Sequence, residues 1–376
     1  MDLNEIRNEI DVIDSKLIEL LEKRMDCTKA VGEYKLEHNI PILDKERQNA
    51  ILDKVEESAE KYGAQLRFIF EDIMHLSRMS QSRIIGDSPF QKTIDHIQAN
   101  IKKMPTSNVK VACQGIRGAN SHIACDEFFE SCDISFHKTF AGVFEAVKND
   151  EADFGVLPVE NTSGGSVSDV YDLLMSHNFY IVSAKAMTIS HNLCALRQSE
   201  LSDIEQVWSH PQALTQCSSY ISKNDLTPIA YANTAIAAKK VMEEKRLNCA
   251  AICTTQAAQE YGLKVLEQNI QDYNKNTTRF IVISKKPYIS ENANKISLCF
   301  NVEHEEGALS KVLNMFSLLG LNLTKIESRP MKNAEFDYLF YLDFTGNLHD
   351  KSVMDFLCIL SQEVKVFSFM GNYFEN

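Results

Sequence analysis

Apolar residues recur at steps of three and four along the start of the chain, which is the spacing of one face of a helix. The stripe consists of Leu3, Ile6, Ile10, Ile13, Leu17 and Leu20. Its next position is Arg24, and the apolar pattern then resumes at Cys27, Val31 and Tyr34. We therefore predict one long helix that carries a guanidinium group on its apolar face.

The same periodicity continues as far as residue 85. Breaks fall at Pro41 and Gly63, because proline cannot continue a helix and glycine is common at helix ends. Residues 86–107 read as a polar linker. We predict an all-α domain over residues 1–85, followed by a connector.

Residues 108–285 alternate between short apolar strands and helices. The predicted strands are VKVACQG, ADFGVLPVE, FYIVSAKAMTIS, EQVWSHP, CAAICT and RFIVIS. This alternation is typical of an α/β fold with largely parallel sheets, and the segment is long enough for two lobes.

Residues 294–376 have a different order again. KISLCFNV alternates cleanly between apolar and polar positions, and a helix, two strands, a second helix and a last strand follow. This βαββαβ order predicts a ferredoxin-like domain.

Composition narrows the classes of partner. The chain has 376 residues and a formal net charge of −13, which argues against nucleic acid as the main partner. Its 10 cysteines show no C-x-x-C pair, so we expect a reduced, cytoplasmic protein. Because no apolar run could cross a membrane and no metal or nucleotide motif is present, we expect no membrane partner, no metal and no cofactor.

Helix geometry suggests a ligand for the cation on the apolar face. Arg24 and Lys35 lie on one face ~16 Å apart, so both could bind one small dianion. Arg7 lies ~42 Å from Lys35 along the helix, and we expect it to serve the site of a partner in an antiparallel dimer. Alternatively, Arg24 pairs with a carboxylate inside a helical bundle.

Residues 1–85 resemble the all-helical chorismate mutases. The elements that match are IRNEID, LLEKRMDCTKAVGEYK, PILDKERQ and LSRMSQS. The resemblance implies that Arg7, Arg24, Lys35 and Gln81 are catalytic and that Asp44, Arg47, Gln48 and Ser77 bind the substrate chorismate. The rearrangement of chorismate to prephenate needs positioned charges rather than proton transfer. Gln48 stands where the family usually has glutamate, so we expect an altered pH dependence or affinity.

Polar residues at strand ends and helix starts mark the middle segment. Such positions bind ligands in α/β proteins, although glycines also make turns, and Asn and Ser also cap helices. The stretches GVLPVENTSGGSVSDVYDLL, SHPQALTQC, ANTAIAAK and YGLKVLEQNIQDYNKNTTRF resemble prephenate dehydratase. The resemblance covers residues 108–285 and implies a site in the cleft between two lobes. It places the chain crossing near 184–188 and the return near 262.

The resemblance makes Thr278 the catalytic residue, which we expect to donate a hydrogen bond to the leaving hydroxyl group. Glu160 is a candidate proton donor, and Arg279 is a candidate partner of a substrate carboxylate or a brace of its loop. The predicted substrate-binding residues are Glu160, Asn161, Ser163, Ser209, His210, Gln212, Gln216 and Arg279.

EEGALSKVL and NLTKIESRP in the tail resemble the ACT regulatory domain attached to prephenate dehydratases. This implies a pocket for L-phenylalanine, an allosteric inhibitor, at the interface of a homodimer or a higher oligomer. Its predicted residues are Gly307, Ala308, Leu309, Asn322, Leu323, Glu327, Ser328, Arg329 and Pro330. Two alternatives stay open: arogenate as the dehydratase substrate, and a sensor without catalytic activity.

Overall fold

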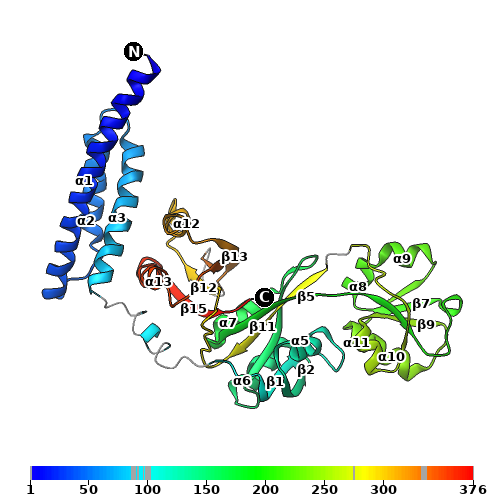
Figure 1. The fold of residues 1–376 in the computed structure, drawn as a ribbon. Helices are drawn as coiled ribbons and strands as arrows, with labels where there is room; N and C mark the ends of the chain where they lie inside the picture. Colours follow the sequence, from blue (N-terminus) through cyan, green and yellow to red (C-terminus); the bar gives the residue numbers. More distant parts are fainter. Residues whose placement is uncertain are drawn as a thin grey trace.

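The computed structural model describes residues 2–85, 90, 93–95, 97, 103–273, 276–331 and 337–375. The helices α1 (Leu3–Glu37), α2 (Lys45–Ser58) and α3 (Gly63–Ile85) form an arm at one end of the molecule, and an α/β lobe forms the other end (Figure 1). A second α/β lobe and a C-terminal sheet lie between them. Within the described parts of the chain, no helix is long and apolar enough to cross a membrane.

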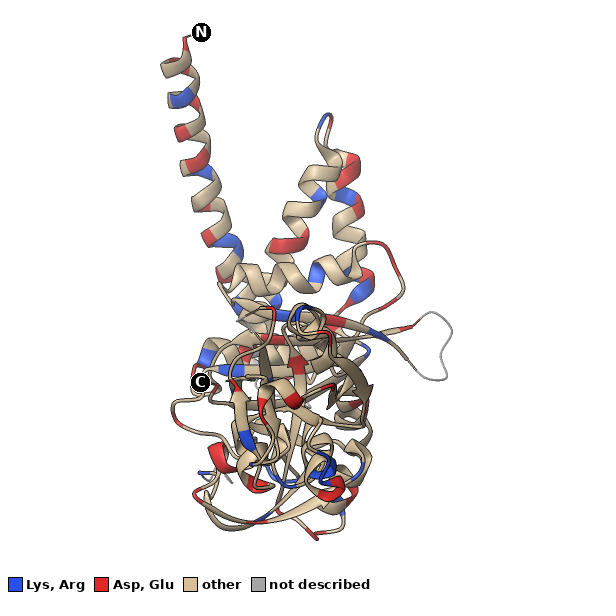
Figure 2. Ribbon diagram, turned by 90° about the vertical axis from the view of Figure 1, so that its right-hand side faces the viewer, with Lys and Arg blue, Asp and Glu red and all other residues tan. Residues whose placement is uncertain are grey.

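Local sequence explains the helical arm. Asp2 and Glu5 form a reciprocal capping box at the start of α1, and the side chain of Asp44 caps α2. Helices α1 and α3 pack closely at Gly32, where an added Cβ would lie 3.3 Å from the Cα of Gln81. The N-terminal half of α1 projects beyond the other two helices, with charged residues of both signs along it (Figure 2).

The connector is not polar throughout. Phe90, Ile94 and Ile97 are buried in the core of the C-terminal domain, and their spacing of four and three is that of one helix face. The prediction of a polar linker over 86–107 is corrected at these positions. Residues 86–89, 91, 92, 96 and 98–102 of this linker lie outside the described residues.

The first α/β lobe is built on a sheet with the strand order β2-β1-β3-β11-β5, and β4 pairs with β3. Its elements are β1 (Ser107–Gln114), α5 (Asn120–Phe128), β2 (Ser131–His137), α6 (Phe140–Lys148), β3 (Phe154–Asn161), β4 (Gly165–Ser166), α7 (Ser168–His177), β5 (Tyr180–Thr188) and β11 (Thr277–Ser284).

The second lobe has the strand order β10-β6-β9-β7-β8. Its elements are β6 (Asn192–Ala195), a 3-10 turn (Leu201–Asp203), β7 (Gln206–Ser209), α8 (Pro211–Gln216), α9 (Ser218–Lys223), β8 (Thr227–Ala230), α10 (Thr234–Glu244), β9 (Cys249–Cys253), α11 (Thr255–Glu260) and β10 (Lys264–Glu267). The chain crosses to it after β5 and returns after β10, which is later than the return predicted near 262.

Both sheets are mixed, so the prediction of largely parallel sheets is wrong. β1 pairs with β2 and β3 in parallel, but β11 runs antiparallel to both β3 and β5. The reason is topological: β5 leads out of the first lobe and β11 returns beside it, so these two neighbours run in opposite directions. The amide of Ile189 donates to the carbonyl of Asn276 at 2.8 Å, which holds the two crossing segments together.

The C-terminal domain follows the predicted βαββαβ order. Its elements are β12 (Lys295–Asn301), α12 (Ala308–Leu318), β13 (Leu323–Pro330), β14 (Tyr338–Thr345), α13 (Lys351–Glu363) and β15 (Val366–Tyr373). They form an antiparallel sheet in the order β13-β14-β12-β15, so β13 is an edge strand. Gly371 of β15 has a φ of +146° and passes directly over the carbonyl of Ile181 in β5, where no larger residue fits.

Candidate functional sites

The helical arm encloses a cavity of about 310 Å³. It gathers seven of the predicted residues: Arg24, Lys35, Asp44, Arg47, Gln48, Ser77 and Gln81. Thr28 and Arg78 also line it. The sequence analysis did not predict either residue, although Thr28 lies one turn from Arg24 on the same helix and Arg78 follows Ser77.

Hydrogen bonds hold the cations of this cavity in place. Arg24 donates to the hydroxyl of Ser77 at 2.7 Å, and no ion pair with a carboxylate is found for it in the described part of the chain. Lys35 donates to the carbonyl of Ile42 at 2.7 Å, and burial lowers the pKa of its ammonium group while Asp44 opposes that shift. The buried amide oxygen of Gln81 has no partner among the described residues. Arg24, Lys35, Arg47 and Arg78 supply the positive charge with which the cavity can hold an anion, whereas the unpaired Gln81 oxygen can only accept a hydrogen bond from a ligand.

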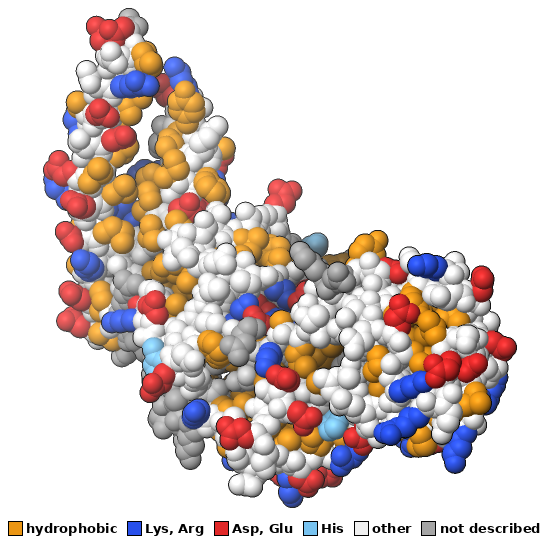
Figure 3. Space-filling view, turned by 45° about the vertical axis from the view of Figure 1, so that its right-hand side comes forward, with side chains coloured by type: hydrophobic (Ala, Val, Ile, Leu, Met, Phe, Trp, Pro, Cys, Tyr) orange, Lys and Arg blue, Asp and Glu red, His pale blue; other side chains and the backbone are white. Residues whose placement is uncertain are grey.

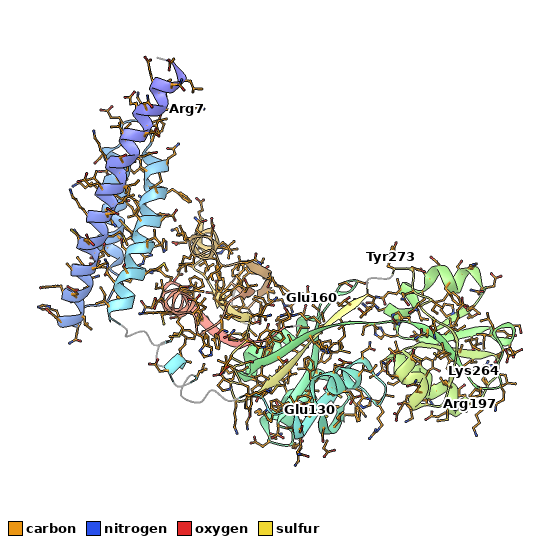
Figure 4. All side chains as sticks on the ribbon, viewed as in Figure 1. Arg7, Glu130, Glu160, Arg197, Lys264 and Tyr273 are labelled. Carbon is orange, nitrogen blue, oxygen red and sulfur yellow. The ribbon has the colours of Figure 1, made fainter. Side chains whose placement is uncertain are left out.

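Arg7 lies far from this cavity. It is near the free end of α1, away from the other two helices (Figure 4). The apolar stripe around it is exposed: the exposed fraction is 49% for Ile10 and 50% for Leu17. Figure 3 shows hydrophobic side chains gathered on this arm. The structure therefore does not bring Arg7 together with Arg24 within one chain.

A second cavity of about 270 Å³ lies between the two α/β lobes. Five predicted residues line it: Asn161, His210, Gln212, Gln216 and Thr278. Strand β11 brings Thr278 opposite Asn161 of β3, and the second lobe supplies the other three from α8 and its N-cap residue His210. The motifs thus converge where the chain crosses between lobes.

Asn161 organises this cavity. Its Nδ2 donates to the hydroxyl oxygen of Thr278 at 2.9 Å, and its Oδ1 accepts from Gln212 across the cleft at 3.2 Å. Because the Thr278 oxygen already accepts a hydrogen bond, its own proton is left to point toward a ligand. At Gly164, an added Cβ would lie 2.5 Å from the Gln212 amide nitrogen, so only glycine permits this closeness.

His191 and Asn276 are site residues that the sequence analysis missed. Both lie on the crossing segments and are buried. His191 Nε2 lies 2.7 Å from the side-chain oxygen Oε1 of Gln216. The side-chain amide of Asn276 donates to that same Oε1 atom at 3.1 Å. Burial lowers the pKa of His191, and the bond to Gln216 opposes the shift. Only the pairing of the two crossings brings these side chains together, and no sequence motif contains both.

Four predicted residues do not line the cleft. Ser209 is buried and donates to the carbonyl of Ile252 at 2.6 Å, while Ser163 is exposed and contributes its backbone amide to Asn161. Glu160 and Arg279 face the C-terminal domain, because they alternate along their strands with Asn161 and Thr278. Glu160 pairs with Lys325 at 3.2 Å, and its position is shown in Figure 4.

Arg279 is enclosed by the C-terminal domain. It forms ion pairs with Asp343 at 2.6 Å and with Glu375, and it donates to the Tyr373 hydroxyl at 2.8 Å. These partners hold β11 against the C-terminal domain, which agrees with the predicted bracing role, and Arg279 does not line the described cleft.

The predicted regulatory residues fall into two groups. Ala308 and Leu309, which follow Gly307 at the start of α12, line a cavity of about 390 Å³ with Tyr338 and Phe340. The second group lies along β13 and just before it: Asn322, Leu323, Glu327, Ser328, Arg329 and Pro330. Of these, Arg329 and Pro330 line a different cavity, of about 710 Å³. Among the described residues, the two groups therefore line separate cavities of one chain.

Among the described residues, no group of three or more His, Cys, Asp or Glu side chains could hold a metal ion.

Two family models match the segments that carry the two cavities: chorismate mutase type II over residues 6–82, and prephenate dehydratase over residues 111–288. Fold and sites thus define an enzyme with two catalytic domains on one chain.

Relatives share this arrangement over their full length. The bifunctional chorismate mutase/prephenate dehydratase of Aquifex aeolicus is 34% identical, covering 99% of this chain and 98% of that protein. The enzyme of the same description from Escherichia coli K12 is 31% identical, covering 98% and 95%. The chain belongs to the family of bifunctional chorismate mutase/prephenate dehydratases. The predicted pair of activities is confirmed, and the sensor alternative is set aside.

Solved structures resemble the part that follows the helical arm. A prephenate dehydratase from Arthrobacter aurescens in complex with L-Phe superposes with a TM-score of 0.65 at 28% identity, covering 70% of this chain and 89% of that chain. The prephenate dehydratase from Staphylococcus aureus Mu50 gives a TM-score of 0.63 at 26% identity, covering 70% of this chain and all of that chain.

Proposed function

We propose that the helical cavity rearranges chorismate to prephenate, that the interlobe cleft converts prephenate to phenylpyruvate, and that L-phenylalanine inhibits the enzyme through the C-terminal domain. The observation that carries this proposal is the hydrogen bond that Asn161 donates to the Thr278 hydroxyl oxygen in the cleft. Asn161 fixes the oxygen of that hydroxyl group, so the proton can be directed at the group that must leave.

In the mutase cavity the protein supplies position and charge. Arg24 binds one carboxylate of chorismate, because a guanidinium group matches a planar carboxylate. Lys35 and Gln81 face the ether oxygen, on which negative charge develops as its bond to carbon breaks. No proton transfer is required, which agrees with a cavity whose described polar groups are mainly donors.

The second carboxylate is bound by Arg7 of a second copy of the chain. The distance along α1 excludes Arg7 from its own cavity, and the exposed apolar stripe around Arg7 is a surface that an antiparallel dimer would bury. We therefore propose a homodimer in which each cavity is completed by its partner.

In the cleft, prephenate loses carbon dioxide and its ring hydroxyl group. Breaking the bond to carbon dioxide supplies the electron pair that makes the ring aromatic, and the hydroxyl departs with a hydrogen bond from Thr278. Glu160 lies outside the cleft and is paired with Lys325, so we no longer propose it as the proton donor.

The C-terminal domain is proposed to be a ferredoxin-like ACT domain that binds L-phenylalanine. Its βαββαβ order and the L-Phe complex of the Arthrobacter aurescens enzyme support this. The edge strand β13 can pair with that of a second copy, which would join the two groups of regulatory residues from different chains. We propose a cytoplasmic enzyme, in keeping with its 10 cysteines, none of which forms a disulfide among the described residues.

Purified protein incubated with chorismate tests the proposal. Loss of chorismate with formation of phenylpyruvate, slowed by L-phenylalanine, is the expected result. Accumulation of prephenate would contradict the dehydratase assignment, and unchanged chorismate would contradict the mutase assignment. Because a relative from Arabidopsis thaliana, 36% identical over 78% of this chain, is named an arogenate dehydratase/prephenate dehydratase, turnover of arogenate is compared in parallel.

A further inference from the structure

Arg78 of α3 is a buried cation at the junction of two domains. It follows Ser77 in sequence and lines the mutase cavity, and its exposed fraction is 7%. Helix α3 lies beside α13 of the C-terminal domain (Figure 1). The Nε atom of Arg78 lies 2.7 Å from a carboxylate oxygen of Glu363, the last residue of α13. Its N–H group does not point at that oxygen, so the contact is an ion pair held by charge rather than a hydrogen bond. A residue of the mutase cavity is thus joined by an ion pair to a separate domain.

Glu363 supplies the negative charge that balances the buried guanidinium group of Arg78. A guanidinium group removed from water needs a counter-ion, and Glu363 is the carboxylate paired with Arg78 among the described residues. A second neighbour of Arg78 is His75, whose Nδ1 atom lies 2.8 Å from Nη2 of Arg78. Burial, Arg78 and Lys311 lower the pKa of His75 to about 4, so its imidazole is neutral and accepts a hydrogen bond.

The other end of Arg78 reaches a substrate-binding residue. Nη1 of Arg78 donates to the side-chain oxygen of Gln48 at 2.8 Å. Gln48 lines both the mutase cavity and a second cavity of about 340 Å³ between the arm and the C-terminal domain. A glutamine amide can present either its oxygen or its nitrogen, and the bond from Arg78 decides which. Its oxygen is occupied, so Nε2 is the group offered to a ligand.

We propose that Arg78 and Glu363 are positioning residues of the mutase reaction: Glu363 orients Arg78, and Arg78 holds the Gln48 amide so that its nitrogen donates to the substrate. The C-terminal domain thereby completes the mutase site without touching the substrate. This inference rests on the mutase activity of the helical arm, and it assigns Gln48 a donor role that an anchored glutamate could not take at neutral pH.

The test is the Glu363→Gln variant of the full-length chain, which keeps the shape but removes the charge. We expect the mutase kcat/KM to fall by about tenfold, because a displaced binding group weakens catalysis at a distance. The dehydratase rate on prephenate, measured on the same sample, should stay within about twofold and shows that the chain is folded. Glu200→Gln is the matched control, since it removes a carboxylate from the Lys264 ion pair in the second lobe.

A double-mutant cycle separates positioning from simple domain adhesion. In a Gln48→Ala background, Glu363→Gln should cause no further loss of mutase activity, because the group that it positions is gone. Independent losses that multiply in the double variant would overturn the proposal, as would a Glu363→Gln enzyme with unchanged mutase kcat/KM. A wild-type chain without mutase activity would instead refute the proposed function on which the inference rests.

Discussion

At the scale of single residues, the proposed dehydratase mechanism depends on Thr278 and Asn161. A Thr278→Val variant keeps the shape of the side chain but removes the hydroxyl group. We expect the dehydratase kcat to fall by about 10²- to 10³-fold, the usual loss when one preorganised donor is removed. Steady-state assays with prephenate measure it. Thr278→Ser, which restores a hydroxyl group, should recover most of the rate, and mutase turnover should be unaffected. Full dehydratase activity in the valine variant would remove Thr278 from the mechanism.

If Lys35 acts as proposed, it should set the alkaline limit of the mutase activity. The ammonium group must be charged to face developing negative charge, and burial lowers its pKa. The charged, active form is therefore present at low and neutral pH and is lost as pH rises through that lowered pKa, which lies below the usual range for lysine. A pH profile of the mutase kcat/KM measures the free-enzyme value. A Lys35→Arg variant stays charged, so a decline that persists at the same pH in that variant would exclude Lys35 as its source.

At the scale of elements, Gly371 governs how β15 packs on β5. A Cβ at this position would overlap the carbonyl of Ile181, and the φ of +146° already disfavours other residues. We expect Gly371→Ala to lower the free energy of unfolding by about 3 kcal/mol, measured by urea denaturation. Gly320→Ala is the control: its φ of +64° is also left-handed, but the space around it is open. It should cost only about 1–2 kcal/mol. Equal losses would show that contact with Ile181 does not matter.

The strands of the two lobes differ in how well the sequence predicts them. The six predicted strands exist because long apolar runs fill buried sheet positions. The other strands of the two lobes, β2, β4, β6, β8 and β10, were not predicted. Four of them are mostly half-exposed or exposed, and β6 is buried but only four residues long, so none gives a strong apolar run. Thr278 and Asn161 stood in recognisable motifs, whereas His191 and Asn276 meet only after the chain crosses and returns. Strand alternation alone could have shown that Glu160 points away from Asn161.

At the scale of the whole molecule, the proposed homodimer predicts that the mutase site needs two chains. If Arg7 serves the partner's cavity, Arg7→Ala and Arg24→Ala enzymes are each inactive as mutases. Mixing them under subunit exchange should restore activity, because a mixed dimer contains one cavity that has both arginines. Random mixing makes half of the dimers mixed, with one working cavity each, so about a quarter of wild-type mutase activity should return.

The control for this experiment is a mixture of Arg24→Ala and Lys35→Ala enzymes. Both residues line the same cavity of the same chain, so every cavity in that mixture lacks one of them and no activity should return. Recovery only in the mixture with Arg7→Ala would place Arg7 in the partner's site. Absence of recovery in both mixtures, with subunit exchange verified by mass spectrometry, would mean that the exposed stripe of α1 does not deliver Arg7 to a second copy.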